Sequence, residues 1–145
     1  MSIAALESGI AINNASVTLV HGMSRPIGAL FRVSHGISNA MLLEKCISFA
    51  ADGAYHLFGE LGRTIGAAAA EDSDEKAARA FIAAVGELCR KCEVPTPEQY
   101  GIEREKFFGA MEKMANDAAA SGSPANTIKE VSVKDMIAIY QSLWS

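Results

Sequence analysis

The stretch that decides the fold is residues 72–95, DSDEKAARAFIAAVGELCRKCEVP, near the middle of the chain. Asp72 and Glu75 stand three residues apart, which is the spacing of a helix capping box. Apolar residues then recur at intervals of three and four, as on the buried face of a helix, and Pro95 ends the pattern. The apolar positions are Ala78, Phe81, Ile82, Val85, Leu88 and Cys89. These features predict one amphipathic helix that packs against a larger apolar body.

The same pattern continues on both sides of this helix. Ser132 and Asp135 predict a second capping box, before a helix that runs to the end of the chain, and residues 103–120 predict another helix. The expected inward side chains of these two helices are Phe107, Phe108, Met111 and Met114, followed by Val133, Met136, Ile137, Tyr140, Leu143 and Trp144. The two Pro residues of Val94-Pro95-Thr96-Pro97 predict an extended connector.

The first half of the chain is helical in composition but less clearly two-faced. Residues 4–20 are apolar on most sides, which is typical of a helix enclosed by other structure. Ser34 is the expected N-cap of a following apolar helix, and the glycines at 59, 62 and 66 fall in a further one, where close packing must offset their cost. Residues 1–145 therefore predict a single all-α domain, a bundle of about six helices.

Composition excludes several classes of function. The 145 residues are 50% hydrophobic and 21% charged, with a net charge of −4, which is unlike a disordered chain or a nucleic-acid-binding surface. No apolar run reaches the roughly 18–20 residues of a membrane span. Three cysteines do not make a disulfide scaffold. We expect a cytoplasmic protein that binds neither nucleic acid nor membrane.

Two of the three histidines lie close to chain-breaking residues. His21 and His35 are separated by fourteen residues, and Pro26, Gly28 and Gly36 predict a helix end, a turn and a helix start around them. Converging imidazoles are common ligands of Fe²⁺ and Zn²⁺. Spacing alone leaves two interpretations open, because histidines in apolar segments are more often ordinary core or surface residues than ligands.

A family resemblance favours the metal interpretation. His21-Gly22-Met23-Ser24, followed by His35-Gly36, resembles the C-terminal signature of iron-dependent (group III) alcohol dehydrogenases, where a His-x-Met-x-His run precedes a His-Gly at the start of the next helix. The resemblance spans nearly the whole chain. Its further parts, in order, are Asn14-Ala15-Ser16, Ser38-Asn39-Ala40, Val94-Pro95, Gly122-Ser123-Pro124 and Ile139-Tyr140-Gln141-Ser142-Leu143-Trp144.

The resemblance implies a specific chemistry. Enzymes of this family join a nucleotide-binding α/β domain to a C-terminal helical domain and hold a divalent metal, iron or zinc, between them. One Asp and three His bind the metal, which polarises the alcohol or carbonyl oxygen while NAD(P) exchanges a hydride. His21 and His35 match the last two ligands. Arg25 stands where the family has the substrate-facing second His of the His-x-Met-x-His run, and its guanidinium cannot relay a proton as imidazole does.

The resemblance also identifies what this sequence lacks. The Asp and the first His of the ligand set precede the aligned region, and so does the nucleotide-binding domain. Gly59, Gly62 and Gly66 do not replace that domain, because they do not form a Gly-x-Gly-x-x-Gly motif after a strand. We expect the chain to be inactive alone, either as a fragment or as a truncated relative. Its expected partner is the missing N-terminal half or a second copy, in a homo-oligomer.

A second hypothesis belongs to another class of function. The apolar first helix would be exposed without the missing segments, and exposed apolar patches are typical of association surfaces. The alternative is therefore a non-catalytic helical module that binds itself or a partner. The remaining candidates have structural interpretations: Cys89 and Cys92 form a Cys-x-x-Cys pair on a helix without further ligands, and His56 is an ordinary helix residue.

Overall fold

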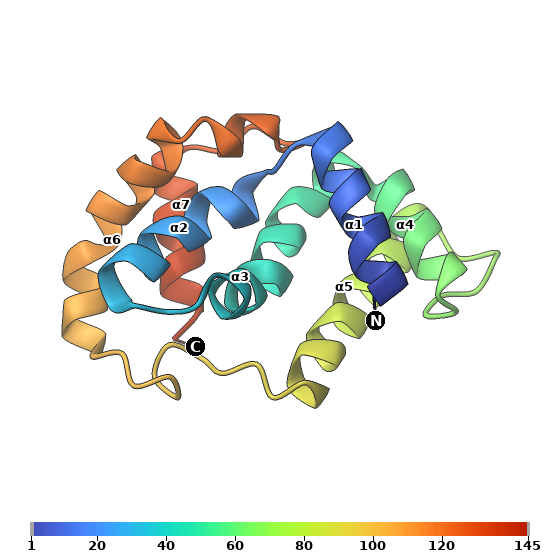
Figure 1. Cartoon of the computed structure of the whole chain (residues 1–145). Coiled ribbons are helices and arrows are strands. Elements are labelled where there is room, and N and C mark those ends of the chain that lie inside the picture. Colours follow the sequence, from blue (N-terminus) through green and yellow to red (C-terminus); the bar gives the residue numbers. More distant parts are fainter. Residues whose placement is uncertain (1, 145) are drawn as a thin grey trace.

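The computed structural model describes residues 2–144, and that range is all helical with no strand (Figure 1). This confirms the all-α class, with seven α-helices where the sequence predicted about six. The elements are α1 (Ser2–Ala15), α2 (Leu19–Phe31), α3 (His35–Ala50), the short 3₁₀-helix η1 (Ala51–Gly53), α4 (Tyr55–Thr64), α5 (Asp74–Lys91), α6 (Arg104–Ala120), the 3₁₀-helix η2 (Ser123–Asn126) and α7 (Val133–Ser142).

The additional helix is α2, and it corrects the prediction that Pro26 and Gly28 break the chain. Both lie inside α2, which continues to Phe31 and ends at Arg32 in the left-handed conformation with φ 55°. Proline fixes φ near the helical value, so Pro26 is compatible with the helical backbone conformation. Its cost here is the loss of one backbone N–H hydrogen bond. The buried face, which carries Leu19, Met23 and Ile27 at four-residue spacing, offsets that cost by packing into the core.

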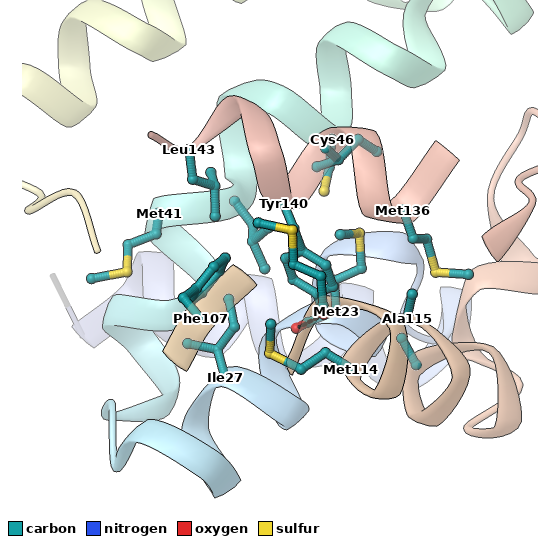
Figure 2. Packing of buried hydrophobic residues seen from close by; sticks show 14 of the residues in the cluster. Met23, Ile27, Met41, Cys46, Phe107, Met114, Ala115, Met136, Tyr140 and Leu143 are labelled. Carbon is teal, nitrogen blue, oxygen red and sulfur yellow. Dashed lines mark hydrogen bonds between the residues drawn. The ribbon is translucent and has the colours of Figure 1, made fainter. Parts of the chain in front are cut away.

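The core lies among α2, α3, α6 and α7. Figure 2 shows Met23 and Ile27 of α2 facing Phe107 of α6 and Tyr140 of α7. Buried Tyr140 donates its hydroxyl hydrogen to the Met23 carbonyl at 2.7 Å, so α7 is tied to α2 by a polar bond as well as by packing. A hydroxyl buried without such a partner would be costly, and this bond therefore fixes the register of the two helices.

Helices α4 and α5 form an antiparallel hairpin at the side of this core. Its close contact depends on glycine, as the sequence predicted: a Cβ at Gly59 would lie 2.9 Å from the Asp74 carbonyl oxygen, and one at Gly62 would lie 2.3 Å from that of Ala77. Gly66 does not belong to this contact, because it lies beyond the end of α4 with φ +73°.

The helix caps differ in part from those predicted. Ser132 and Asp135 form the expected capping box at the start of α7. At α5 the N-cap is Ser73, whose side chain accepts from the Lys76 N–H. Asp72 instead accepts a hydrogen bond from the Ala69 N–H and pairs with Lys76, so its carboxylate stabilises the turn before the helix.

Replacing Ser132 with alanine should lower the free energy of unfolding by about 1 kcal/mol, because the α7 N-cap would lose its acceptor. The matched control is Lys134→Ala, at an exposed position in the same first turn. Urea denaturation followed by circular dichroism measures both. Equal losses in the two variants would contradict the role of the capping box.

Helix α6 has the predicted extent, but its buried face is narrower than the sequence predicted. Phe107, Met111 and Met114 are buried, as expected, but Phe108 is 37% exposed. Phe108 lies about 100° around the helix from Phe107, so its ring cannot enter the core on the same side. Phe108 instead covers the edge of Trp144, with its ring centre 6.0 Å from that of the indole.

Helix α1 stands outside the bundle. Every residue from Ser2 to Ala15 is exposed, although the helix is apolar on most sides, and Figure 1 shows it projecting on the side of the view that carries α4. No single helix within residues 2–144 is long and apolar enough to cross a membrane. Only α1 and α2 taken together meet that length and composition, and they are bent by 106°.

Candidate metal centre

The structure brings His21 and His35 together. Their ring centres are 5.4 Å apart and the ring planes are inclined at 52°. His21 is the third residue of α2 and is half-buried, while His35 is the exposed first residue of α3. The predicted helix end, turn and helix start therefore exist, but the turn is only residues 32–34.

Local packing explains why the two rings meet. Buried Val33 anchors the turn to the core, and a Cβ at Gly28 would lie 3.2 Å from the Val33 carbonyl oxygen. The small residue at 28 thus lets the turn lie close against the end of α2. This places the first turn of α3, with His35, beside the first half of α2, with His21.

The spacing of the rings fits two ligands of one ion. Metal–nitrogen bonds of about 2.0–2.1 Å in tetrahedral geometry place the centres of two imidazoles on one ion roughly 5 Å apart. The observed 5.4 Å is close to this separation. Two neutral imidazoles are also a donor set suited to Fe²⁺ or Zn²⁺. This separation is therefore the one expected if both imidazoles bind one ion.

The electrostatic environment lowers the pKa of His21. Burial lowers the pKa of the His21 imidazole below its usual value, and the neighbouring His35 and Arg25 lower it further when they are charged. A metal ligand must be unprotonated, so a lowered pKa makes the His21 nitrogen available at lower pH. Arg25 is exposed and lies one helical turn after His21, so it adds positive charge beside the pair.

Replacing Arg25 with alanine should raise the His21 pKa, because one of the charges that oppose protonation is removed. The value should stay below that of a free imidazole, since burial and His35 remain. A pH titration of the histidine ring protons by NMR measures this. Arg90→Ala, on exposed α5 surface, is the control and should leave the His21 titration unchanged.

Asn39 is a neighbour of the pair that the sequence did not identify as a site residue. The side-chain nitrogen of Asn39 lies 3.0 Å from Nε2 of His35, one helical turn away on α3. The buried side-chain oxygen, Oδ1, has no hydrogen-bond partner. The four-residue spacing from His35 was the available signal, because residues at that interval share a helix face. Asn39 therefore restrains the orientation of the His35 ring.

The other candidates lie away from this site or lack ligands. Within the described range 2–144, no cluster of three or more His, Cys, Asp or Glu side chains is placed to hold a metal ion. His56 is exposed on α4. The cysteines Cys46, Cys89 and Cys92 are free thiols, and Cys46 is buried.

The described residues define the class of this chain as an all-helical domain, whose helices α2 and α3 bring two imidazoles together. The sequence profile described as "Fe-containing alcohol dehydrogenase family, C-terminal" matches residues 1–144. The chain therefore belongs to the iron-containing alcohol dehydrogenase family and corresponds to its C-terminal helical domain.

Curated relatives are longer than this chain. Lactaldehyde reductase of Escherichia coli (strain K12) is 27% identical over 145 residues, which are 99% of this chain and 37% of that enzyme. The 1,3-propanediol dehydrogenase of Klebsiella pneumoniae is 28% identical over 125 residues, or 86% of this chain and 32% of that enzyme. The chain thus spans about a third of the length of these relatives.

Solved structures show the same fold. A 1,3-propanediol oxidoreductase superposes with a TM-score of 0.85 at 24% identity, covering 93% of this chain and 35% of that protein. An alcohol dehydrogenase from Oenococcus oeni gives a TM-score of 0.83 at 25% identity, covering 92% of this chain and 34% of that protein. The helical arrangement is therefore that of the C-terminal domain in complete enzymes.

Proposed function

We propose that this chain is the metal-side helical domain of an iron-dependent alcohol dehydrogenase-like oxidoreductase, and that it is inactive alone. The observation that carries the proposal is the pair of His21 and His35 rings, 5.4 Å apart in a geometry suited to one shared ion. In this proposal both imidazoles bind Fe²⁺ or Zn²⁺. The remaining ligands and the NAD(P) site come from a polypeptide that corresponds to the preceding part of the relatives.

The chemistry of the complete site follows from its parts. The metal supplies Lewis-acid polarisation of an alcohol or carbonyl oxygen, and NAD(P) supplies hydride transfer. In this chain, His21 and His35 hold the ion, and Asn39 restrains the His35 ring. Arg25 faces the same region with a permanent positive charge and is suited to bind an anionic group of the substrate or cofactor. The names of the relatives favour a small alcohol or aldehyde as substrate.

Metal titration tests the ligand assignment directly. The purified chain should bind Co²⁺, a spectroscopic probe for Fe²⁺ or Zn²⁺, weakly through the two imidazoles, and His21→Ala or His35→Ala should abolish the binding. His56→Ala, which removes the third histidine, is the matched control and should leave it unchanged. Binding that survives in the double variant His21→Ala/His35→Ala would overturn the assignment.

Complementation tests the incompleteness of the site. Co-expression with the preceding two-thirds of a relative should tighten metal binding and restore alcohol oxidation with NAD(P). The Arg25→Ala variant of that complex should keep its metal. Its KM should rise for the substrate or cofactor whose anionic group Arg25 binds. Alcohol oxidation by the chain alone would contradict the proposal.

A second candidate function is favoured by the exposure of α1. A non-catalytic helical module that associates through this helix accounts for an apolar helix with no buried residue. Both functions agree with the prediction of a cytoplasmic location.

A further inference from the structure

Two of the three cysteines lie at the end of α5. Cys89 is half-buried and Cys92 is exposed, whereas Cys46 is buried in the core. Cys92 is the C-cap residue, directly after Lys91, the last residue of the helix. Residues three apart on an α-helix have Cα atoms about 5 Å from each other. Disulfides join Cα atoms that are roughly 4.4–6.8 Å apart, so the backbone separation of this pair is suited to one.

The backbone at the end of α5 is held by a Schellman motif. The Val94 N–H donates to the Cys89 carbonyl at 3.0 Å, across the residues that separate the two cysteines from the connector. The Glu93 N–H donates to the Arg90 carbonyl at 3.0 Å, and Glu93 is in the left-handed conformation with φ 54°. Because Cys92 lies at the boundary of the helix, its sulfur can approach that of Cys89 without disturbing the interior of α5.

The two thiols have different surroundings. Burial raises the pKa of the Cys89 thiol, and the charges of Glu44 and Cys92 raise it further. The Arg90 guanidinium acts in the opposite sense. Glu44 lies on α3 and packs against α5, since a Cβ at Gly86 would lie 2.7 Å from its carboxylate. The thiolate is the reactive form of cysteine, so the exposed Cys92 is the thiol expected to react first and Cys89 the second.

We propose that Cys89 and Cys92 are a reversible redox site, which closes to a disulfide on reaction with a small-molecule disulfide. The sequence favoured a structural interpretation of this pair because a metal site needs more ligands. The described residues 2–144 indeed place no third ligand there. A disulfide needs only the two sulfurs, and the end of α5 places them one turn apart. The proposal is independent of the proposed metal centre.

The reaction is two steps of thiol–disulfide exchange. The Cys92 thiolate attacks one sulfur of the small disulfide, whose S–S bond breaks, and one small thiolate leaves. The Cys89 thiol then loses its proton, and its sulfur attacks Sγ of Cys92 and releases the second small thiolate. Two protein thiols are thereby oxidised to one disulfide. The small disulfide is reduced to two thiols, which take up the two protons.

Peptide mapping tests the bond, because Arg90 and Lys91 provide tryptic cleavage sites between the two cysteines. After incubation with glutathione disulfide, the intact chain should be lighter by two hydrogen atoms. Trypsin should then release peptides 80–90 and 92–104 joined to each other, and dithiothreitol should separate them. Cys46, which is 2% exposed, should be alkylated only after denaturation and serves as the internal control.

Single variants test the order of the two steps. Cys89→Ser should stop at the mixed disulfide on Cys92. Cys92→Ser should form a mixed disulfide at least about tenfold more slowly, because its remaining thiol at the end of α5 is half-buried and has a raised pKa. Glu44→Gln should shorten the lifetime of the mixed disulfide in the otherwise natural chain, since it removes a charge that opposes ionisation of Cys89. Glu112→Gln, at an exposed position on α6, is the matched control.

The contrary outcomes are equally distinct. A chain that does not react, or that remains at the mixed disulfide, would overturn the proposal. A product of twice the chain mass, which reports a bond between two molecules, would also overturn it. A mixed disulfide that lasts as long in Glu44→Gln as in Glu112→Gln would contradict the role of Cys89 as the second nucleophile. Circular dichroism checks that each variant is folded.

Discussion

Replacing Phe107 with alanine should lower the free energy of unfolding by about 3–5 kcal/mol. Phe107 is fully buried, and its ring lies 5.5 Å from Phe31, 5.9 Å from Tyr140 and 5.5 Å from Trp144, centre to centre. Its ring therefore contacts the end of α2 and also Tyr140 and Trp144 of the C-terminal segment. Removing it leaves a cavity that these helices cannot close without shifting. Urea denaturation followed by circular dichroism measures the loss.

The next residue provides the control. Phe108→Ala removes the same side chain from the same helix, but at a position that is 37% exposed. Its contacts are with Trp144 and with the Arg104 guanidinium, which lies 5.1 Å from the ring centre. We expect a loss of at most about 1.5 kcal/mol, because these contacts lie at the surface. Similar losses for the two variants would contradict the central position of Phe107.

The effect of Phe107 should extend to the histidine pair. Phe31 is the last residue of α2, and the turn that follows it leads to His35. Because Phe107 holds Phe31 in place, the alanine variant should also weaken Co²⁺ binding, although Phe107 touches neither histidine. In this way the core determines the geometry of the candidate metal centre.

Much of the fold could be predicted from local patterns. Helices α5, α6 and α7 have apolar residues at regular helical spacing and clear ends, so their existence follows from the sequence alone. The prediction that Phe108 points into the core was wrong. Phe107 and Phe108 are equally apolar, so the sequence does not show which of the two is buried. Helix α2 was missed because Pro26 and Gly28 disfavour a helix locally, and only the tertiary burial of Met23 and Ile27 compensates.

The candidate site depended on a different kind of inference. The fourteen-residue separation of His21 and His35 does not by itself place them together, because a helix, a turn and a second helix can orient them in many ways. The resemblance to a family supplied that proximity, and the 5.4 Å between the rings agrees with it. Asn39 was not identified as a site residue, because an amide carries no signal until its contact with His35 is seen.

The exposure of α1 is related to the length of this chain relative to its curated relatives. The sequence predicted a helix enclosed by other structure, yet the described residues leave it bare. Because the chain spans about a third of its curated relatives, the relatives have further polypeptide that can cover such a helix. Completion by that polypeptide is therefore one way to bury the surface of α1.

Replacing Gly62 with alanine should lower the free energy of unfolding by about 3 kcal/mol, the upper end of the range for overpacking. The new Cβ would lie 2.3 Å from the Ala77 carbonyl oxygen and 3.1 Å from the carbonyl carbon. That carbonyl belongs to the helical backbone of α5 and cannot rotate away, so α4 and α5 must separate along their contact. Thermal and urea denaturation should both show the loss.

Gly109→Ala is the matched control for this prediction, and its effect should have the opposite sign. Gly109 lies in the interior of α6, and a Cβ there would meet nothing within 4 Å. Alanine is favoured over glycine in a helix by about 0.5–1 kcal/mol, so this variant should be slightly more stable than the natural protein. The same chemical change thus stabilises one helix and destabilises the other, depending only on what the added methyl group meets. If Gly62→Ala were also stabilising, α4 and α5 would not pack as closely as the structure shows.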